Sequence, residues 1–160
     1  MGSFISKDCY EIVHRNIFNF NYGGVLLVLV ESYILNMYLM IRVVRARKQY
    51  DVEFPNLYSD RSMDFNCIQR GHQNYLESTL FFIPFLLISG LKYPRFAFLT
   101  GTTYLLGRLC YAHGYTAENV NKRSCGMKMS MFGGLLPLVG SVGVLAVGCL
   151  MKKTNTNLNN

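Results

Sequence analysis

The stretch FNCIQRGHQNYLES, residues 65–78, is followed almost at once by the apolar run LFFIPFLLISGL, residues 80–91. Arg70, Asn74 and Glu77 stand four and three residues apart, which places a cation, an amide and a carboxylate on one face of a helix. The helix then continues into a segment that is apolar enough to enter a bilayer. Placing polar groups at the end of a membrane span costs free energy unless these groups bind a partner or a ligand. Two interpretations stay open: a site for a small zwitterionic ligand, or an internal Arg70–Glu77 pair with Asn74 satisfied between helices.

Composition indicates an integral membrane protein of one domain. The 160 residues are 51% hydrophobic and only 16% charged, well below the roughly 25% charged residues of soluble domains. The net charge of +7 comes mostly from cations that flank apolar runs, where they contact lipid headgroups, so we do not expect nucleic-acid binding. The five cysteines show neither disulfide nor metal-ligand spacing, and no metal site is predicted.

Four apolar runs are long enough to cross a hydrocarbon core of roughly 30 Å. They cover approximately residues 23–44, 65–91, 96–115 and 127–150. Short connections between them predict an all-α fold, an antiparallel four-helix bundle in the membrane. Three regions are expected along the chain: an N-terminal extension over 1–22, the four-span domain over 23–150, and a disordered polar tail over 151–160.

The distribution of cations predicts the orientation of the bundle. Cations are most numerous around the connections after the first and third runs, namely Arg42, Arg45, Arg47, Lys48, Arg61, Lys122, Arg123 and Lys128. These connections are expected in the cytosol and both termini on the other side. The opening residues MGSFIS match an N-myristoylation pattern at Gly2, but this topology keeps Gly2 away from the cytosolic acylating enzyme. Within the runs, we expect Glu31 and Asn36 to face other helices and Pro84 to kink the second helix.

Antiparallel packing brings three polar helix ends to one membrane face. To the group on the second helix it adds the residues Arg47 and Lys48 from the first helix and Tyr104, Arg108, Tyr111 and Tyr115 from the third, with Lys122 and Arg123 just beyond. The third-helix residues are spaced four, three and four apart and therefore share one face. Such a site suits a ligand with two carboxylates, one ammonium and a group to be activated. Glutathione has this pattern, and an arginine near its sulfur would lower the thiol pKa by favouring the thiolate.

The motif FNCIQRGHQNYLE, preceded by RARKQYDVEFP and followed by GRLCYAHGY and NKRS, resembles the family of membrane-associated proteins in eicosanoid and glutathione metabolism (MAPEG), in particular its type-three microsomal glutathione transferases. The resemblance runs from about Val44 to Gly126. It implies a homotrimer in the endoplasmic reticulum membrane, with glutathione bound as co-substrate between subunits. It also implies a lipophilic electrophile or lipid hydroperoxide that arrives from the bilayer, and no prosthetic group. The distribution of cations predicts that the active site faces the cytosol.

The resemblance also implies roles for individual residues that bind glutathione. Arg70, Asn74 and Glu77 match the family's R-x-x-x-N-x-x-E glutathione motif. The tyrosine pair of the third helix corresponds to Tyr111 and Tyr115. Arg47 matches a further family residue, an arginine at the end of the first helix that reaches a neighbour's glutathione. Arg108 and His72 are additional candidates for contact with the ligand.

The arginine that stabilises the thiolate matches Arg123 when the loop is aligned as in the type-three branch. An ungapped count against the leukotriene-synthase branch selects Lys122 instead, which lacks the planar fork of arginine. That branch has Gln at His72 and Tyr at Ser78, so leukotriene-synthase-like binding is not assured, and the second substrate stays open. We therefore predict a membrane glutathione transferase with peroxidase activity. The alternative is a non-catalytic scaffold that binds lipid and presents fatty acids to a partner enzyme.

Overall fold

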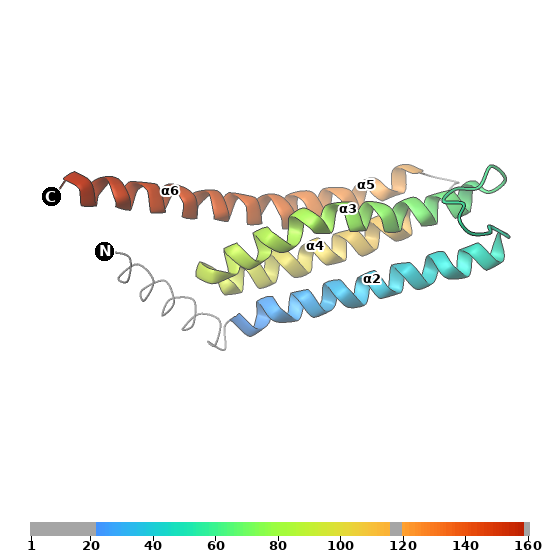
Figure 1. Ribbon diagram of the computed structural model, residues 1–160, viewed down its shortest axis with the longest axis horizontal. Helices are drawn as coiled ribbons and strands as arrows, with labels where there is room; N and C mark the ends of the chain where they lie inside the picture. The colour runs from blue at the N-terminus through green and yellow to red at the C-terminus, as the bar shows by residue number, and fades with distance from the viewer. Residues whose placement is uncertain (1–21, 116–119, 159–160) are drawn as a thin grey trace.

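The computed structural model describes residues 22–115 and 120–158, and these residues form helices and connecting turns with no strand among them (Figure 1). The elements are α2 (Gly23–Gln49), α3 (Met63–Lys92), α4 (Pro94–Gly114), the short 3-10 helix η2 (Val120–Lys122), α5 (Arg123–Ser130), the π-helical turn η3 (Met131–Leu135) and α6 (Leu136–Leu158). The all-α prediction is confirmed.

The long helices lie side by side and alternate in direction along the chain (Figure 1). α4 packs against α2 and α3 and also against α5, which continues through η3 into α6 as one rod. The α2–α3 connection and the start of α5 lie at the same end of the molecule, and α6 extends beyond α3 and α4 at the other end (Figure 1). The polar stretch at the start of α3 is therefore brought close to the end of α4 and the beginning of α5.

Three helical segments are long and apolar enough to cross a membrane: Gly23–Gln49, Met63–Lys92 and Arg123–Met151. α4 is not among them. Its 21 residues include Arg108 and several threonines and glycines, which lower its mean hydropathy. Because α4 packs against three other helical segments, polar residues on it can face protein instead of lipid.

Local sequence signals account for the two ends of α3. The Ser62 hydroxyl accepts a hydrogen bond from the Phe65 backbone N–H at 3.2 Å, and Asp64 lies in the first turn, so the helix is capped and carries an acid at its positive end. At the other end only Tyr93 separates α3 from α4, which starts with Pro94 at a position where a missing N–H costs nothing. The short connection that the sequence predicts here is confirmed, and α3 continues through Pro84 without interruption.

Close packing of small residues joins α5 and η3 to α4. A Cβ atom on Gly126 would collide with the Tyr111 backbone, and one on Gly107 would collide with the Ser130 backbone. A Cβ on Gly134 would meet Tyr104. Small residues allow membrane helices to approach this closely. The contact fixes the start of α5 beside the last turns of α4.

Helix α6 differs from its prediction at its end. The polar residues 151–158, which we expected to be disordered, continue α6 to Leu158, whereas 159 and 160 lie outside the described residues. Adding residues to an existing helix needs no new nucleation, so a polar tail can extend it. The first helix likewise runs on to Gln49, past the predicted end of its apolar run. Of the predicted N-terminal extension only Tyr22 is described; it is buried and its hydroxyl donates to the Leu87 carbonyl at 3.4 Å.

Candidate functional site

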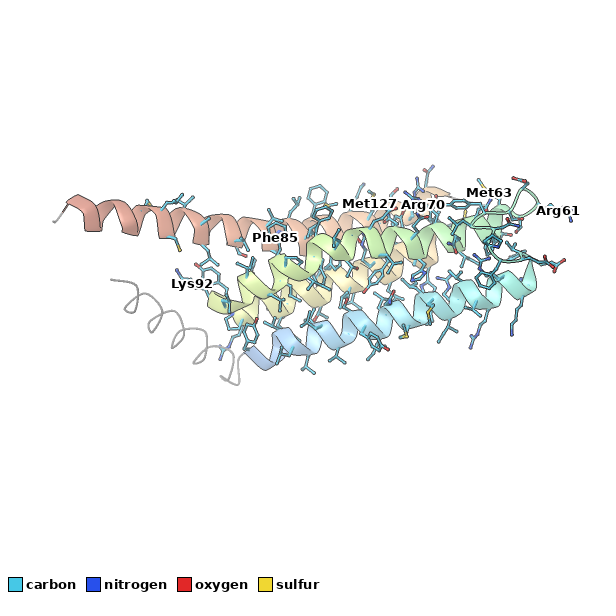
Figure 2. All side chains as sticks on the ribbon, viewed as in Figure 1. Arg61, Met63, Arg70, Phe85, Lys92 and Met127 are labelled. Atoms are coloured by element: carbon cyan, nitrogen blue, oxygen red, sulfur yellow. The ribbon has the colours of Figure 1, made fainter. Side chains whose placement is uncertain are left out.

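Arg70 and Glu77 form an ion pair on the outside of α3. One guanidinium nitrogen of Arg70 lies 3.0 Å from Oε1 of Glu77, and the two side chains are 41% and 50% exposed. Figure 2 shows Arg70 on the half of α3 near the α2–α3 connection, with Met63 at the start of the helix and Lys92 at its far end. A pair this exposed contributes only about 0.2–1 kcal/mol to stability. Both charges therefore stay accessible to a ligand at little cost.

Asn74 is held from the other side by Arg108 of α4. One guanidinium nitrogen of Arg108 donates to Oδ1 of Asn74 at 3.1 Å, and another donates to the Asn74 carbonyl at 3.4 Å. A guanidinium only donates, so the amide oxygen must face Arg108. The amide N–H₂ of Asn74 is left to donate elsewhere. This orientation suits a ligand carboxylate or carbonyl, and it does not suit an ammonium.

A buried chain of hydrogen bonds continues from Arg108 to α3. Nε of Arg108 donates to the Tyr104 hydroxyl at 3.3 Å, and that hydroxyl donates to the Ser78 oxygen at 2.8 Å. The Ser78 hydroxyl in turn donates to the Tyr75 carbonyl at 2.9 Å. The Tyr104 ring stacks on Phe82 with ring centroids 4.0 Å apart. Every donor in the chain has an acceptor, so Arg108 is fixed in place by satisfied polar groups inside the packed helices.

Tyrosine rings and two arginines form a continuous row of contacts along the rest of this face of α4, with Arg123 contributed by α5. The Arg108 guanidinium carbon lies 5.4 Å from the Tyr104 ring and 5.7 Å from the Tyr111 ring. The rings of Tyr111 and Tyr115 are 5.8 Å apart, and the Arg123 guanidinium lies 4.5 Å from the Tyr115 ring. The distances from the two guanidinium groups to the tyrosine rings are short enough for cation–π attraction. The predicted row on α4 thus forms one surface that runs from the interior to Arg123.

Arg123 begins α5, and the first turn of that helix contains no acid. α5 continues directly from η2, so the positive end of the helix dipole lies at the start of this η2–α5 segment and adds to the charge of the side chain. The combination favours an anion such as a thiolate near Arg123. Lys122 is exposed at the end of η2, so of the two candidates it is Arg123 that stands against the tyrosine row.

Arg47 and His72 are placed away from the Asn74–Arg108 contact. Arg47 is buried and donates to the Asn56 carbonyl at 2.9 Å, with the Phe54 ring 4.3 Å from its guanidinium carbon, so it organises the α2–α3 connection. Nε2 of His72 lies 3.1 Å from Oδ1 of Asn36 and links α3 to α2. Asn36 therefore faces another helix as predicted. The Ser78–Tyr104 bond was not predicted from the sequence, although Ser78 lies one turn beyond Asn74 on the same face.

Among the described residues, 22–115 and 120–158, no group of three or more His, Cys, Asp and Glu side chains could hold a metal ion. Cys67 is buried, whereas Cys110, Cys125 and Cys149 are exposed. The chemistry that the described site offers is carried by arginine, amide, carboxylate and phenol groups. These groups can bind a charged peptide and stabilise an anion.

Comparison with known proteins places this arrangement in a family. The family model "MAPEG family" matches residues 25–145, which include most of α2, all of α3, α4 and α5, and the first part of α6. The chain is also similar to "Uncharacterized protein sll1147" of Synechocystis sp. (strain ATCC 27184 / PCC 6803 / Kazusa). The two are 33% identical over 109 residues, which cover 68% of this chain and 77% of the relative.

Proposed function

Because the chain belongs to the MAPEG family, we propose that it is a membrane-bound glutathione transferase with peroxidase activity. The observation that carries the proposal is the unbroken set of contacts from Asn74 through Arg108 and the tyrosines to Arg123. A structural bundle needs satisfied polar groups. It does not need an exposed Arg70–Glu77 pair, and it does not need the Asn74 amide to direct its N–H₂ group away from Arg108.

Charge assigns the parts of glutathione to this surface. Arg70 binds a carboxylate with two N–H groups, and Glu77, released from Arg70, accepts from the ammonium. Asn74 donates its amide N–H₂ to a carboxylate or peptide carbonyl, because Arg108 occupies its oxygen. The phenols of Tyr111 and Tyr115 supply further hydrogen bonds along α4. Replacing the internal ion pair by two ion pairs to the ligand adds contacts without leaving a charge unpaired.

The thiol would lie near Arg123 and lose its proton to water, because the guanidinium and the start of α5 favour the thiolate. With an electrophile, the thiolate forms a carbon–sulfur bond and the leaving group departs, or an epoxide opens and its oxygen takes up a proton. With a hydroperoxide, the thiolate attacks the terminal oxygen and the O–O bond breaks, which gives an alcohol and a sulfenic acid of glutathione. A second glutathione then forms the disulfide and releases water.

The proposal includes the assembly and the place in the cell. All four helical segments cross the endoplasmic reticulum membrane, α4 included because protein shields its polar residues. Three subunits form a homotrimer with glutathione between neighbours and the site open to the cytosol. Arg47 supports the neighbour's glutathione with the guanidinium N–H groups that it does not donate within the α2–α3 connection. The second substrate is a lipophilic electrophile or lipid hydroperoxide from the bilayer.

Steady-state kinetics of the purified, detergent-solubilised protein test the proposal with a model electrophile and a lipid hydroperoxide. Arg123→Ala should lower kcat by at least about 100-fold, the scale found when one preorganised charge-stabilising group is removed, while KM for glutathione changes less than about threefold. The matched control is Arg95→Ala, which removes an exposed arginine from the other end of α4. Turnover in Arg123→Ala within a few-fold of the parent would exclude the thiolate role. Folded protein without any glutathione binding would favour the lipid-binding scaffold.

A further inference from the structure

A groove of about 540 Å³ lies between α2 and α4, separate from the glutathione surface. Its walls are mostly apolar and include Ile34 of α2 and Leu106 and Leu109 of α4. A helix turns about 100° per residue, so these two leucines lie on the opposite side of α4 from Tyr104 and Arg108. The volume falls within the roughly 300–1,000 Å³ that small-molecule sites occupy. The groove is therefore large enough for a ligand of its own.

The groove contains one carboxyl group, and this group lies inside a membrane-spanning segment. Glu31 lines the groove from α2, and its Oε2 accepts a hydrogen bond from the Thr102 hydroxyl at 3.3 Å. Within the described residues, Thr102 is the only hydrogen-bond or ion-pair partner of Glu31. A carboxylate can accept about four hydrogen bonds, so most of this capacity is unused. Since an ionised carboxylate at membrane depth is costly without a partner, Glu31 favours a cationic donor beside it.

The groove itself supplies no cation to Glu31. None of the nine described residues that line it is a lysine or an arginine. His113 lies at the other end, where its Nδ1 donates to the Leu109 carbonyl at 3.0 Å and its Nε2 lies 2.8 Å from the Tyr38 hydroxyl. Tyr38 follows Glu31 by seven residues, a rise of roughly 10 Å along α2 at about 1.5 Å per residue. The charge that complements Glu31 must therefore come from the occupant of the groove.

We propose that the groove binds a lipophilic amine, with its nitrogen beside Glu31 and its apolar body along the leucines of α4. A neutral amine that enters from the lipid accepts the proton of the Glu31 carboxyl group, which leaves an ammonium beside a carboxylate. The ammonium N–H donates to Glu31 in a charge-assisted hydrogen bond, and no net charge has been carried into the membrane.

The rest of the groove fits the apolar body of such an amine. The body extends from Glu31 toward Tyr38 and His113, whose stacked rings, with centroids 5.7 Å apart, line the other end. An anionic ligand is disfavoured beside Glu31, because like charges repel. The site lies on another face of α4 and does not depend on the proposed function.

Equilibrium binding to the purified full chain in nonionic detergent tests this proposal, with dodecylamine and dodecanol as probes of equal chain length. The parent protein should bind the amine about ten-fold more tightly than the alcohol, as a hydrogen bond between charged groups allows. Glu31→Gln keeps an acceptor for the Thr102 hydroxyl and removes the charge, so its affinity for the amine should fall to that for the alcohol. Glu53→Gln, which changes an exposed carboxylate in the α2–α3 connection, should keep the preference of the parent.

A second pair of variants tests where the amine binds. Leu106 is 53% exposed and lines the groove, so the larger side chain of Leu106→Trp should fill the groove and weaken amine binding several-fold without disturbing the packed interior. Leu99 is 64% exposed on α4 and lies outside the groove, so Leu99→Trp should bind the amine as the parent does.

Three results would overturn the proposal. They are equal binding of the two probes by the parent, an amine preference that survives Glu31→Gln, and unchanged amine binding in Leu106→Trp. Equal binding would identify the groove as a site for lipid chains beside a protonated Glu31. If the amine does not bind and Ile34→Cys, in a chain whose native cysteines are replaced by alanine, forms disulfide-linked dimers, the groove is instead an interface between two copies.

Discussion

Tyr104→Phe removes one hydroxyl from the middle of the hydrogen-bond chain that joins α4 to α3. The ring keeps its stacking on Phe82 at 4.0 Å, so the change acts on the two hydrogen bonds alone. The hydroxyl accepts from Arg108 at 3.3 Å and donates to Ser78 at 2.8 Å. After the change Nε of Arg108 has lost its acceptor in a place where water does not replace it, because the Arg108 side chain is only 7% exposed.

The expected cost follows from these two bonds. A neutral hydrogen bond such as Tyr104–Ser78 contributes about 0.5–1.5 kcal/mol, and a bond from a charged donor about 1.5–3 kcal/mol. The 3.3 Å separation of the second bond puts it at the low end of its range. We expect Tyr104→Phe to lower the free energy of unfolding by about 2–3 kcal/mol. Because Arg108 orients Asn74, KM for glutathione should rise several-fold as well.

Reversible unfolding of the protein in mixed detergent measures the first effect, and a double-mutant cycle with Ser78→Ala isolates the bond between the two hydroxyls. The coupling energy in the cycle should be about 1 kcal/mol. Tyr33→Phe is the matched control, since Tyr33 is 64% exposed on α2, and it should stay within about 0.5 kcal/mol of the parent. A Tyr104→Phe protein as stable as the control, or a coupling energy near zero, would show that the chain of hydrogen bonds does not hold Arg108.

Three further predictions concern the packing and the ligand surface. Gly126→Ala should lower the free energy of unfolding by about 1–3 kcal/mol or more and lower kcat, because the added Cβ forces α5 away from α4. A Cβ on Gly140 would meet no atom within 4 Å, so Gly140→Ala should be neutral in the same unfolding assay. Arg70→Ala and Glu77→Gln should each change the free energy of unfolding by less than about 1 kcal/mol but raise KM for glutathione about ten-fold or more. An unchanged KM in both variants would show that the pair does not bind glutathione. Arg47→Ala should cost about 1–3 kcal/mol in unfolding free energy, since it removes the donor to Asn56, and a neutral result would contradict the loop-organising contact.

Helix positions followed closely from the sequence because they depend on local signals. Ser62 and Asp64 mark the start of α3, and Pro94 marks the start of α4, each through a backbone effect that acts within a turn. The alternation of Arg108 with the tyrosines on one face likewise follows from the helical period alone. The tail could not be predicted in this way, because polar composition does not show whether an adjoining helix will extend into it.

The contacts between helices could not be predicted from the sequence. The Asn74–Arg108 and Ser78–Tyr104 bonds depend on how far α4 is shifted along α3, and the spacing within each helix says nothing about that shift. The approach of α5 to α4 at Gly126 also fixes where Arg123 lies, and glycine-rich composition predicts close packing without naming the partner. Arg47 could be assigned to a ligand by resemblance, but its role in the α2–α3 connection needed the structure.

In the proposed function, Arg123 and the start of α5 activate the glutathione thiol. Ultraviolet thiolate absorbance tests it most directly, recorded as glutathione is added to the solubilised protein across a range of pH, with Arg123→Ala beside the parent and Arg95→Ala as control. We expect this activation to give a thiolate band in the parent and the control at pH values below the pKa of the free thiol, and no such band in Arg123→Ala. A parent protein that binds glutathione saturably and shows no thiolate band, or a band that persists in Arg123→Ala, would contradict it.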